Sequence, residues 1–153
     1  MFKRSILLIP ALFGLVALAG CSGSSSSGAS TAYAGQYDGT TTITLTGFGE
    51  TASQTAPLRL IVGVDGRVTA ARPESANAGS CSVNPNGTFI SGNTATNSAT
   101  ISCSVPGVGT CTITGTIKAV FSNNAVSLNG DYDINCPQGY VKGIETGYLT
   151  KTA

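Results

Sequence analysis

From Gln36 to the C-terminus, the sequence alternates between short segments of apolar and hydroxyl residues and clusters of Gly, Asn and Asp. Residues 40–46, for example, place Thr41, Ile43 and Leu45 on one side and threonines on the other. This two-residue period is that of a β-strand with one buried face. No stretch of ten residues in this region has the 3.6-residue period of a helix. The alternation therefore predicts an all-β domain.

Turn signals divide the region into eight expected strands. They cover residues 40–46, 58–64, 67–71, 80–90, 94–104, 110–121, 125–136 and 140–150. An even number of antiparallel strands lets the first strand pair with the last, which leaves no exposed edge. We predict an antiparallel meander that closes into an eight-stranded up-and-down barrel, with a two-sheet β-sandwich as the alternative. The faces rich in Thr and Asn lack the apolar band of a membrane-spanning barrel.

Three of the expected hairpins have recognisable turns. Asp65-Gly66 is a strong signal for a two-residue turn. A two-residue turn at Asn123-Asn124 keeps the apolar residues of both flanking strands on one face. A three-residue loop at 91–93 sets Phe89 opposite Ala95. These turns give a register for each hairpin.

The register in turn selects among the disulfides that four cysteines of the β region allow. The turn at Asn123-Asn124 sets Cys111 opposite Cys136, and the loop at 91–93 sets Cys81 opposite Cys103. A Cys103–Cys111 bond would leave the other two cysteines three strands apart, about 14 Å, which is too far to bridge. The sequence therefore predicts the disulfides Cys81–Cys103 and Cys111–Cys136.

The N-terminal segment, residues 1–20, has the organisation of an export signal. Lys3 and Arg4 precede an apolar run over residues 5–20. This run is short for a transmembrane helix, which needs about 20 apolar residues, and is typical of a signal-peptide core. The run ends in Leu18-Ala19-Gly20-Cys21, which matches the lipobox of bacterial lipoproteins at all four positions. The segment therefore resembles the start of a lipoprotein precursor.

This resemblance implies that Cys21 carries a diacylglycerol, that the chain is cleaved before Cys21, and that the new amino terminus is acylated, commonly with palmitate. Two or more acyl chains anchor a protein stably to a membrane. In Gram-negative lipoproteins, Asp after the lipidated Cys commonly means retention in the inner membrane. Ser22 occupies that position, so we expect attachment to the outer membrane, at its periplasmic face or at the cell surface.

The expected organisation has three parts. Residues 1–20 form the signal peptide, residues 21–34 hold the lipidated Cys and a flexible Gly/Ser-rich tether, and residues 35–153 form a single β domain. The exported location favours disulfides because the compartment is oxidising.

Composition and motifs exclude several classes of function. The chain has 8 Lys+Arg against 7 Asp+Glu, which argues against nucleic acid as a partner. It has no His, and so no Ser-His-Asp or Cys-His catalysis and no imidazole metal site. Asp131-Tyr132-Asp133 looks like the opening of a calcium loop but lacks the required Gly and the closing Glu. We expect no catalytic residue, no metal and no cofactor.

Glu145 is the one candidate for contact with a ligand. It alternates with Gly143 and Gly147, whereas Tyr140, Ile144 and Tyr148 lie on the opposite face of the same expected strand. The tyrosines and Ile144 look more like core residues, so we expect Glu145 to be a surface charge. With the opposite orientation, Glu145 would be a buried carboxylate inside the barrel and a candidate ligand contact.

These observations predict a membrane-anchored, non-enzymatic lipoprotein of the cell envelope that serves as a binding or structural module. Its partner would be a protein or a small apolar ligand. The alternative is a periplasmic inhibitor or chaperone-like lipoprotein that blocks a partner protein through a loop. A third possibility is an envelope hydrolase that uses a pair of carboxylates.

Overall fold

The chain folds into a closed, eight-stranded antiparallel β-barrel, which confirms the predicted fold class. The computed structural model describes residues 31–71, 80–83, 88–105 and 107–152, without the side chains of Thr31, Ala71 and residues 80–83. Its strands are β1 (Gly35–Gly47), β2 (Glu50–Val62), β3 (Arg67–Ala71), β4 (Ser80–Val83), β5 (Thr88–Ser91), β6 (Thr94–Val105), β7 (Gly109–Phe121), β8 (Ala125–Cys136) and β9 (Gly139–Lys151). A 3-10 turn, η4 (Thr31–Tyr33), precedes β1.

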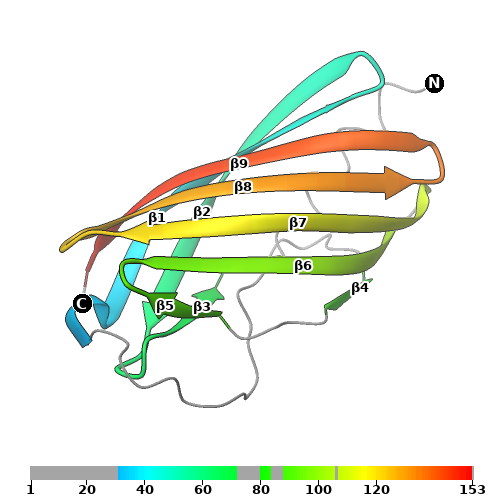
Figure 1. Ribbon diagram of the computed structural model, residues 1–153. Helices are drawn as coiled ribbons and strands as arrows, with labels where there is room; N and C mark the ends of the chain where they lie inside the picture. Colours follow the sequence, from blue (N-terminus) through cyan, green and yellow to red (C-terminus); the bar gives the residue numbers. More distant parts are fainter. Residues whose placement is uncertain (1–30, 72–79, 84–87, 106, 153) are drawn as a thin grey trace.

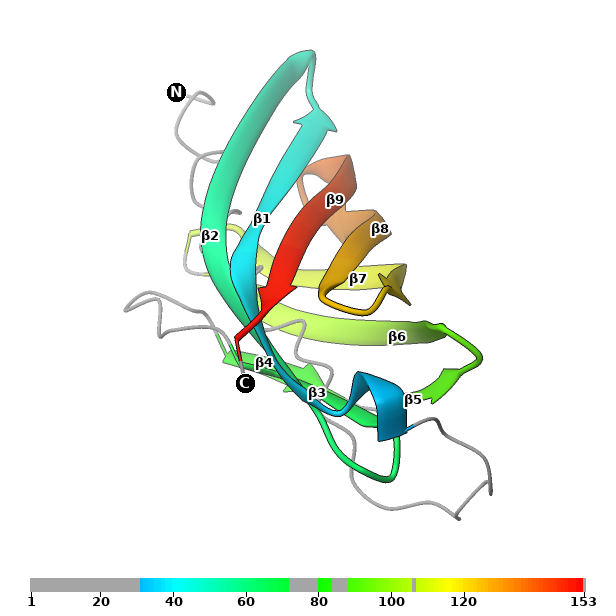
Figure 2. The same cartoon turned by 90° about the vertical axis from the view of Figure 1, so that its left-hand side faces the viewer.

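The strands follow one another around the barrel, as Figures 1 and 2 show. β4 and β5 both pair with β6 and share one position, so the nine described strands fill eight places. The barrel closes because β1 pairs antiparallel with β9 from Tyr37 to Gly47. Among the described residues, no helix has the length and apolarity of a membrane span.

The register of β7 and β8 agrees with the sequence in full. Phe121 pairs with Val126 and the two strands are joined at Asn123-Asn124. The same register brings Cys111 and Cys136 together, and their Sγ atoms are 2.09 Å apart in a disulfide.

The predicted strand over 80–90 is wrong in its second half. β4 has the expected register, with Cys81 opposite Cys103. In β5, however, Ile90 and not Phe89 pairs with Ala95, because the turn contains two residues, with Gly92 at φ +63°. This register points Ile90 into the core. The side chain of Cys81 lies outside the described residues, so the Cys81–Cys103 disulfide stays a prediction.

The hairpin between β2 and β3 also differs from the prediction by one residue. The amide of Gly63 donates to the carbonyl of Arg67, and the amide of Gly66 donates to the carbonyl of Gly63, each at 2.9 Å. The loop is therefore the three residues Val64–Gly66, with Gly66 in the left-handed region at φ +78°. β2 begins at Glu50, eight residues before the expected start, because Phe48 and Gly49 form a tight turn with φ of +54° and +77°.

Among the described residues, two clusters of buried side chains lie in the interior. One lies towards the turns that join β1 to β2, β6 to β7 and β8 to β9; it consists of Ile43, Leu45, Ile101, Cys103, Val105, Val108, Cys111, Ile113, Tyr132, Ile134 and Val141. The other lies towards η4; it consists of Tyr37, Leu58, Leu60, Val62, Val68, Ile90, Ala95, Ile117, Ala119, Phe121, Val126, Leu128 and Leu149. Burial of this apolar surface is the main favourable term in the stability of the barrel.

Candidate functional site

The face of β9 that carries Glu145 points into the barrel, so the expected orientation of this strand is wrong. Glu145 is 0% exposed, whereas Tyr140, Ile144 and Tyr148 are 50%, 51% and 61% exposed. The reason is space. A Cβ atom at the inward position Gly147 would lie 2.6 Å from Cγ2 of Thr41 on the neighbouring strand, so the inward side of β9 has no room for a tyrosine at this position.

Inside the barrel, Glu145 is hydrogen-bonded to Tyr132. The Tyr132 hydroxyl on β8 donates to Oε2 of Glu145 at 2.7 Å, and both groups are buried. The tyrosine ring has room because the facing position on β7 is Gly115, where a Cβ atom would overlap the ring. A buried carboxylate requires such hydrogen bonds, since an unsatisfied charge is costly to remove from water.

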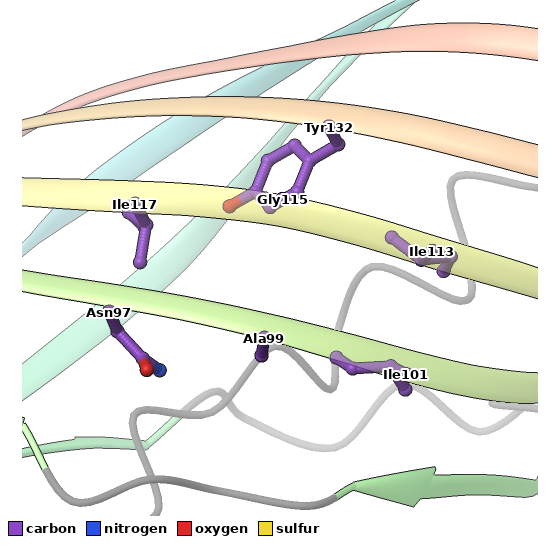
Figure 3. Close-up of a pocket in the computed structure, with 7 residues that line it drawn as sticks. All are labelled: Asn97, Ala99, Ile101, Ile113, Gly115, Ile117 and Tyr132. Carbon is purple, nitrogen blue, oxygen red and sulfur yellow. The ribbon is translucent and has the colours of Figure 1, made fainter.

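Beside the Tyr132 ring, side chains of β6 and β7 line a small void (Figure 3). The remaining void measures about 10 Å³ and is lined by Asn97, Ala99, Ile101, Ile113, Gly115, Ile117 and Tyr132. This volume corresponds to about one water molecule. A small apolar ligand, considered above as a partner, does not fit in this void. The Glu145–Tyr132 hydrogen bond joins β8 and β9 inside the barrel.

The outer face of the barrel has a different character over β6, β7 and β8. Hydroxyl groups pair across β6 and β7, Ser98 with Thr116 at 2.7 Å and Thr100 with Thr114 at 3.3 Å. They line a surface depression of about 490 Å³. Its lining residues are Ser98, Ala99, Thr100, Thr114, Gly115, Thr116, Asp131 and Asp133. We call this depression the hydroxyl groove.

The two carboxylates of the hydroxyl groove are held from β9. The Lys142 ammonium forms ion pairs with Oδ1 of Asp131 and, at 3.3 Å, with Oδ1 of Asp133. The Tyr140 hydroxyl also donates to Oδ1 of Asp133. The hydrogen bonds from Tyr140 and then Lys142 lower the pKa of Asp133, and the bond with Asp131 raises the pKa of Lys142. The carboxylate of Asp133 is therefore charged at neutral pH.

Asp131 and Asp133 lie in the motif that looked like the opening of a calcium loop. They occupy alternate positions on the outer face of β8, with an ammonium between them rather than a loop around them. Among the described residues, no group of three or more Cys, Asp or Glu side chains is placed to hold a metal ion.

A second hydroxyl ladder joins β1 and β2. Its pairs are Thr42 with Thr55 at 2.7 Å, Thr44 with Ser53 at 2.8 Å and Thr46 with Thr51 at 3.2 Å. The next strand, β9, presents Thr146, Ile144 and Lys142 opposite these threonines. This ladder has the same hydroxyl chemistry as the hydroxyl groove but no carboxylate beside it.

The residues singled out in the sequence are thus scattered. Cys21 and the side chain of Cys81 lie outside the described residues, Cys111 and Cys136 form a disulfide in the wall, and Glu145 lies in the interior. The hydroxyls of the groove were missed. The sequence shows only alternate Ser and Thr residues on two expected strands. This pattern indicates a groove only when the register of β6, β7 and β8 is known.

The comparisons with known proteins add nothing to this geometry. A scan against protein-family models, a search of curated proteins and a search of solved structures each found no match.

Proposed function

We propose that the chain is a lipid-anchored protein of the bacterial cell envelope whose barrel is a non-enzymatic binding module. The observation that carries this proposal is the contrast between a void of about 10 Å³ in the interior and a depression of about 490 Å³ on the outer face. Ligand sites usually measure about 300–1,000 Å³. Within the part of the chain that the structure describes, this contrast supports binding on the outer wall of the barrel.

The anchor is proposed from the lipobox that ends in Cys21 and from the Gly/Ser-rich segment that follows it. The barrel starts directly after this tether. The Tyr37 hydroxyl on β1 donates to the carbonyl of Tyr33 at 2.9 Å, which ties the end of η4 to the wall. The β1–β2 turn lies at the opposite end of the barrel from η4 (Figure 1). With an anchor that precedes η4, the proposal places this turn away from the membrane.

A substitution of the lipidated cysteine tests the anchor. We expect Cys21→Ala to give an uncleaved or soluble precursor, whereas Ser26→Ala, in the tether but outside the lipobox, leaves processing unchanged. Immunoblots of membrane and soluble fractions make the measurement. Normally processed Cys21→Ala protein in the membrane fraction would overturn the proposal of a lipid anchor.

A second candidate function is that of a periplasmic inhibitor that acts through a loop. The tip of the β1–β2 hairpin favours it, because Phe48 is 51% exposed and has a positive φ of +54°. A non-glycine residue in this region is a strain that often accompanies a functional tip. Protease treatment of intact cells separates the two locations, since a surface module is cut and a periplasmic inhibitor is protected.

A further inference from the structure

We infer that the hydroxyl groove on β6, β7 and β8 is a binding site for a neutral oligosaccharide. This inference rests on the proposed function and gives the chemical class of its ligand. Four properties of the groove support it: its shape, its hydrogen-bonding groups, its charge and the tyrosine at its rim.

The shape of the hydroxyl groove is set by the small residues at its base. Ala99 on β6 and Gly115 on β7 lie between the hydroxyl walls, and both positions face inward. Gly115 has no side chain because the Tyr132 ring occupies the space behind it. The base of the groove is therefore made by small residues, and a flat ligand comes close to the two strands.

The groups in the walls can both donate and accept hydrogen bonds. In the pairs Ser98–Thr116 and Thr100–Thr114, one hydroxyl hydrogen joins each pair and the other remains available, together with acceptor lone pairs. The contacts of Asp131 and Asp133 all use Oδ1, and within the described residues Oδ2 of each has no partner. Sugar hydroxyls, which also donate and accept, match this set.

The charge around the groove is close to zero, which favours a neutral ligand. Asp131 and Asp133 are balanced by Lys142 and by Lys118, which continues the outer face of β7 after Thr116. A polyanion such as a phosphate-rich glycan would meet two carboxylates, and like charges across an interface are unfavourable. An acyl chain would meet the hydroxyls and carboxylates of the walls, with which it forms no hydrogen bond.

Tyr140 supplies an aromatic surface beside Asp133. The side chain is 50% exposed, and its hydroxyl is held by Oδ1 of Asp133. A tyrosine fixed at its polar end presents an apolar ring face with little loss of conformational freedom on binding. Such a ring can pack against the C–H face of a pyranose while the carboxylates accept from its hydroxyls.

The test is calorimetric titration of the full lipoprotein, purified in a detergent without a sugar headgroup. The probes are three neutral tetrasaccharides: chitotetraose, cellotetraose and maltotetraose. At least one is expected to bind. Thr116→Val and Asp131→Asn should each weaken binding roughly tenfold, since each removes a hydrogen bond to the ligand. Thr42→Val, the same change in the β1–β2 ladder, should leave the affinity unchanged.

Circular dichroism of each variant shows that the fold is intact. The inference is overturned when none of the three probes binds, when binding survives both groove variants, or when polygalacturonate or Ca²⁺ binds in place of the neutral probes. Failure of the anchor is distinguishable, because Cys21→Ala changes the location of the protein and leaves titration of the groove unaffected.

Discussion

The inward and outward faces of this barrel are built from different kinds of residue, although both alternate along the same strands. On β7, Gly115 faces inward beside the Tyr132 ring, and its neighbour Thr116 faces outward beside Ser98. On β9, Glu145 is inside and Tyr148 is outside. The difference shows that local space, as well as polarity, decides which face of a strand lies inside, because inward positions such as Gly115 and Gly147 leave no room for a larger side chain.

The largest expected effect compares two neighbouring residues of β7. Gly115→Val should lower the free energy of unfolding by about 3 kcal/mol, since the new side chain overlaps Tyr132. Thr116→Val, one residue further on, should change it by about 0.5 kcal/mol because it alters only the surface. Urea denaturation measures both. Equal losses from the two variants would contradict the division into a crowded interior and a tolerant exterior.

The next largest expected effect compares the loss of stability on removing the hydroxyl of a buried tyrosine, Tyr132, and of an exposed one, Tyr140. Tyr132→Phe removes the hydroxyl that donates to buried Glu145 and should cost about 1–3 kcal/mol of stability. Tyr140→Phe removes an exposed hydrogen bond to Asp133 and should cost much less stability than Tyr132→Phe, because water replaces the lost partner. Thermal unfolding followed by circular dichroism gives both values. A greater loss from Tyr140→Phe would show that the outer network, rather than the buried pair, supports the fold.

The smallest expected effect concerns stability at acid pH and the ion pair between Asp38 and Arg59 on the outer wall. Hydrogen bonds from Arg59, then Thr152 and Gln36, lower the pKa of Asp38 to about 2. Because the folded-state pKa lies below the ordinary value of 3.8, the carboxylate stabilises the fold above pH 4, and this contribution is lost as the pH falls through about 2. Asp38→Asn should therefore show a smaller loss of stability between pH 4 and pH 2 than the unchanged protein, as measured by urea titrations at each pH. Identical losses would mean that Asp38 is not stabilised in the folded state.

Much of the wall could be predicted from the sequence where several signals agreed. In β7 and β8 the Asn123-Asn124 turn, the alternation and the position of Cys111 and Cys136 all specify one register, and the structure has it. In the hairpins at Gly66 and Gly92 the loop length depends on which residue adopts a positive φ. The composition of a loop does not decide which residue this is. The predicted registers of both hairpins therefore differ by one residue from the observed ones.

The site was harder to predict for a physical reason. A two-residue period defines two faces but not which of them is buried, and on β9 the apolar residues Tyr140, Ile144 and Tyr148 favoured the wrong one. The glycines at 143 and 147 were the better signal, because they mark the crowded side. The hydroxyl groove depends on three strands in register, which no single segment of sequence contains.

The central claim is that the interior maintains the fold and the hydroxyl groove binds the ligand. The most direct test is a ¹H–¹⁵N correlation spectrum of the labelled lipoprotein, recorded during titration with the tetrasaccharide that binds best. We expect shifts at outward residues of the groove, Ser98, Thr116 and Asp131, with the amides of Asn97 and Glu145 unchanged. Shifts confined to the inward residues, or no shifts at saturating sugar, would contradict the account.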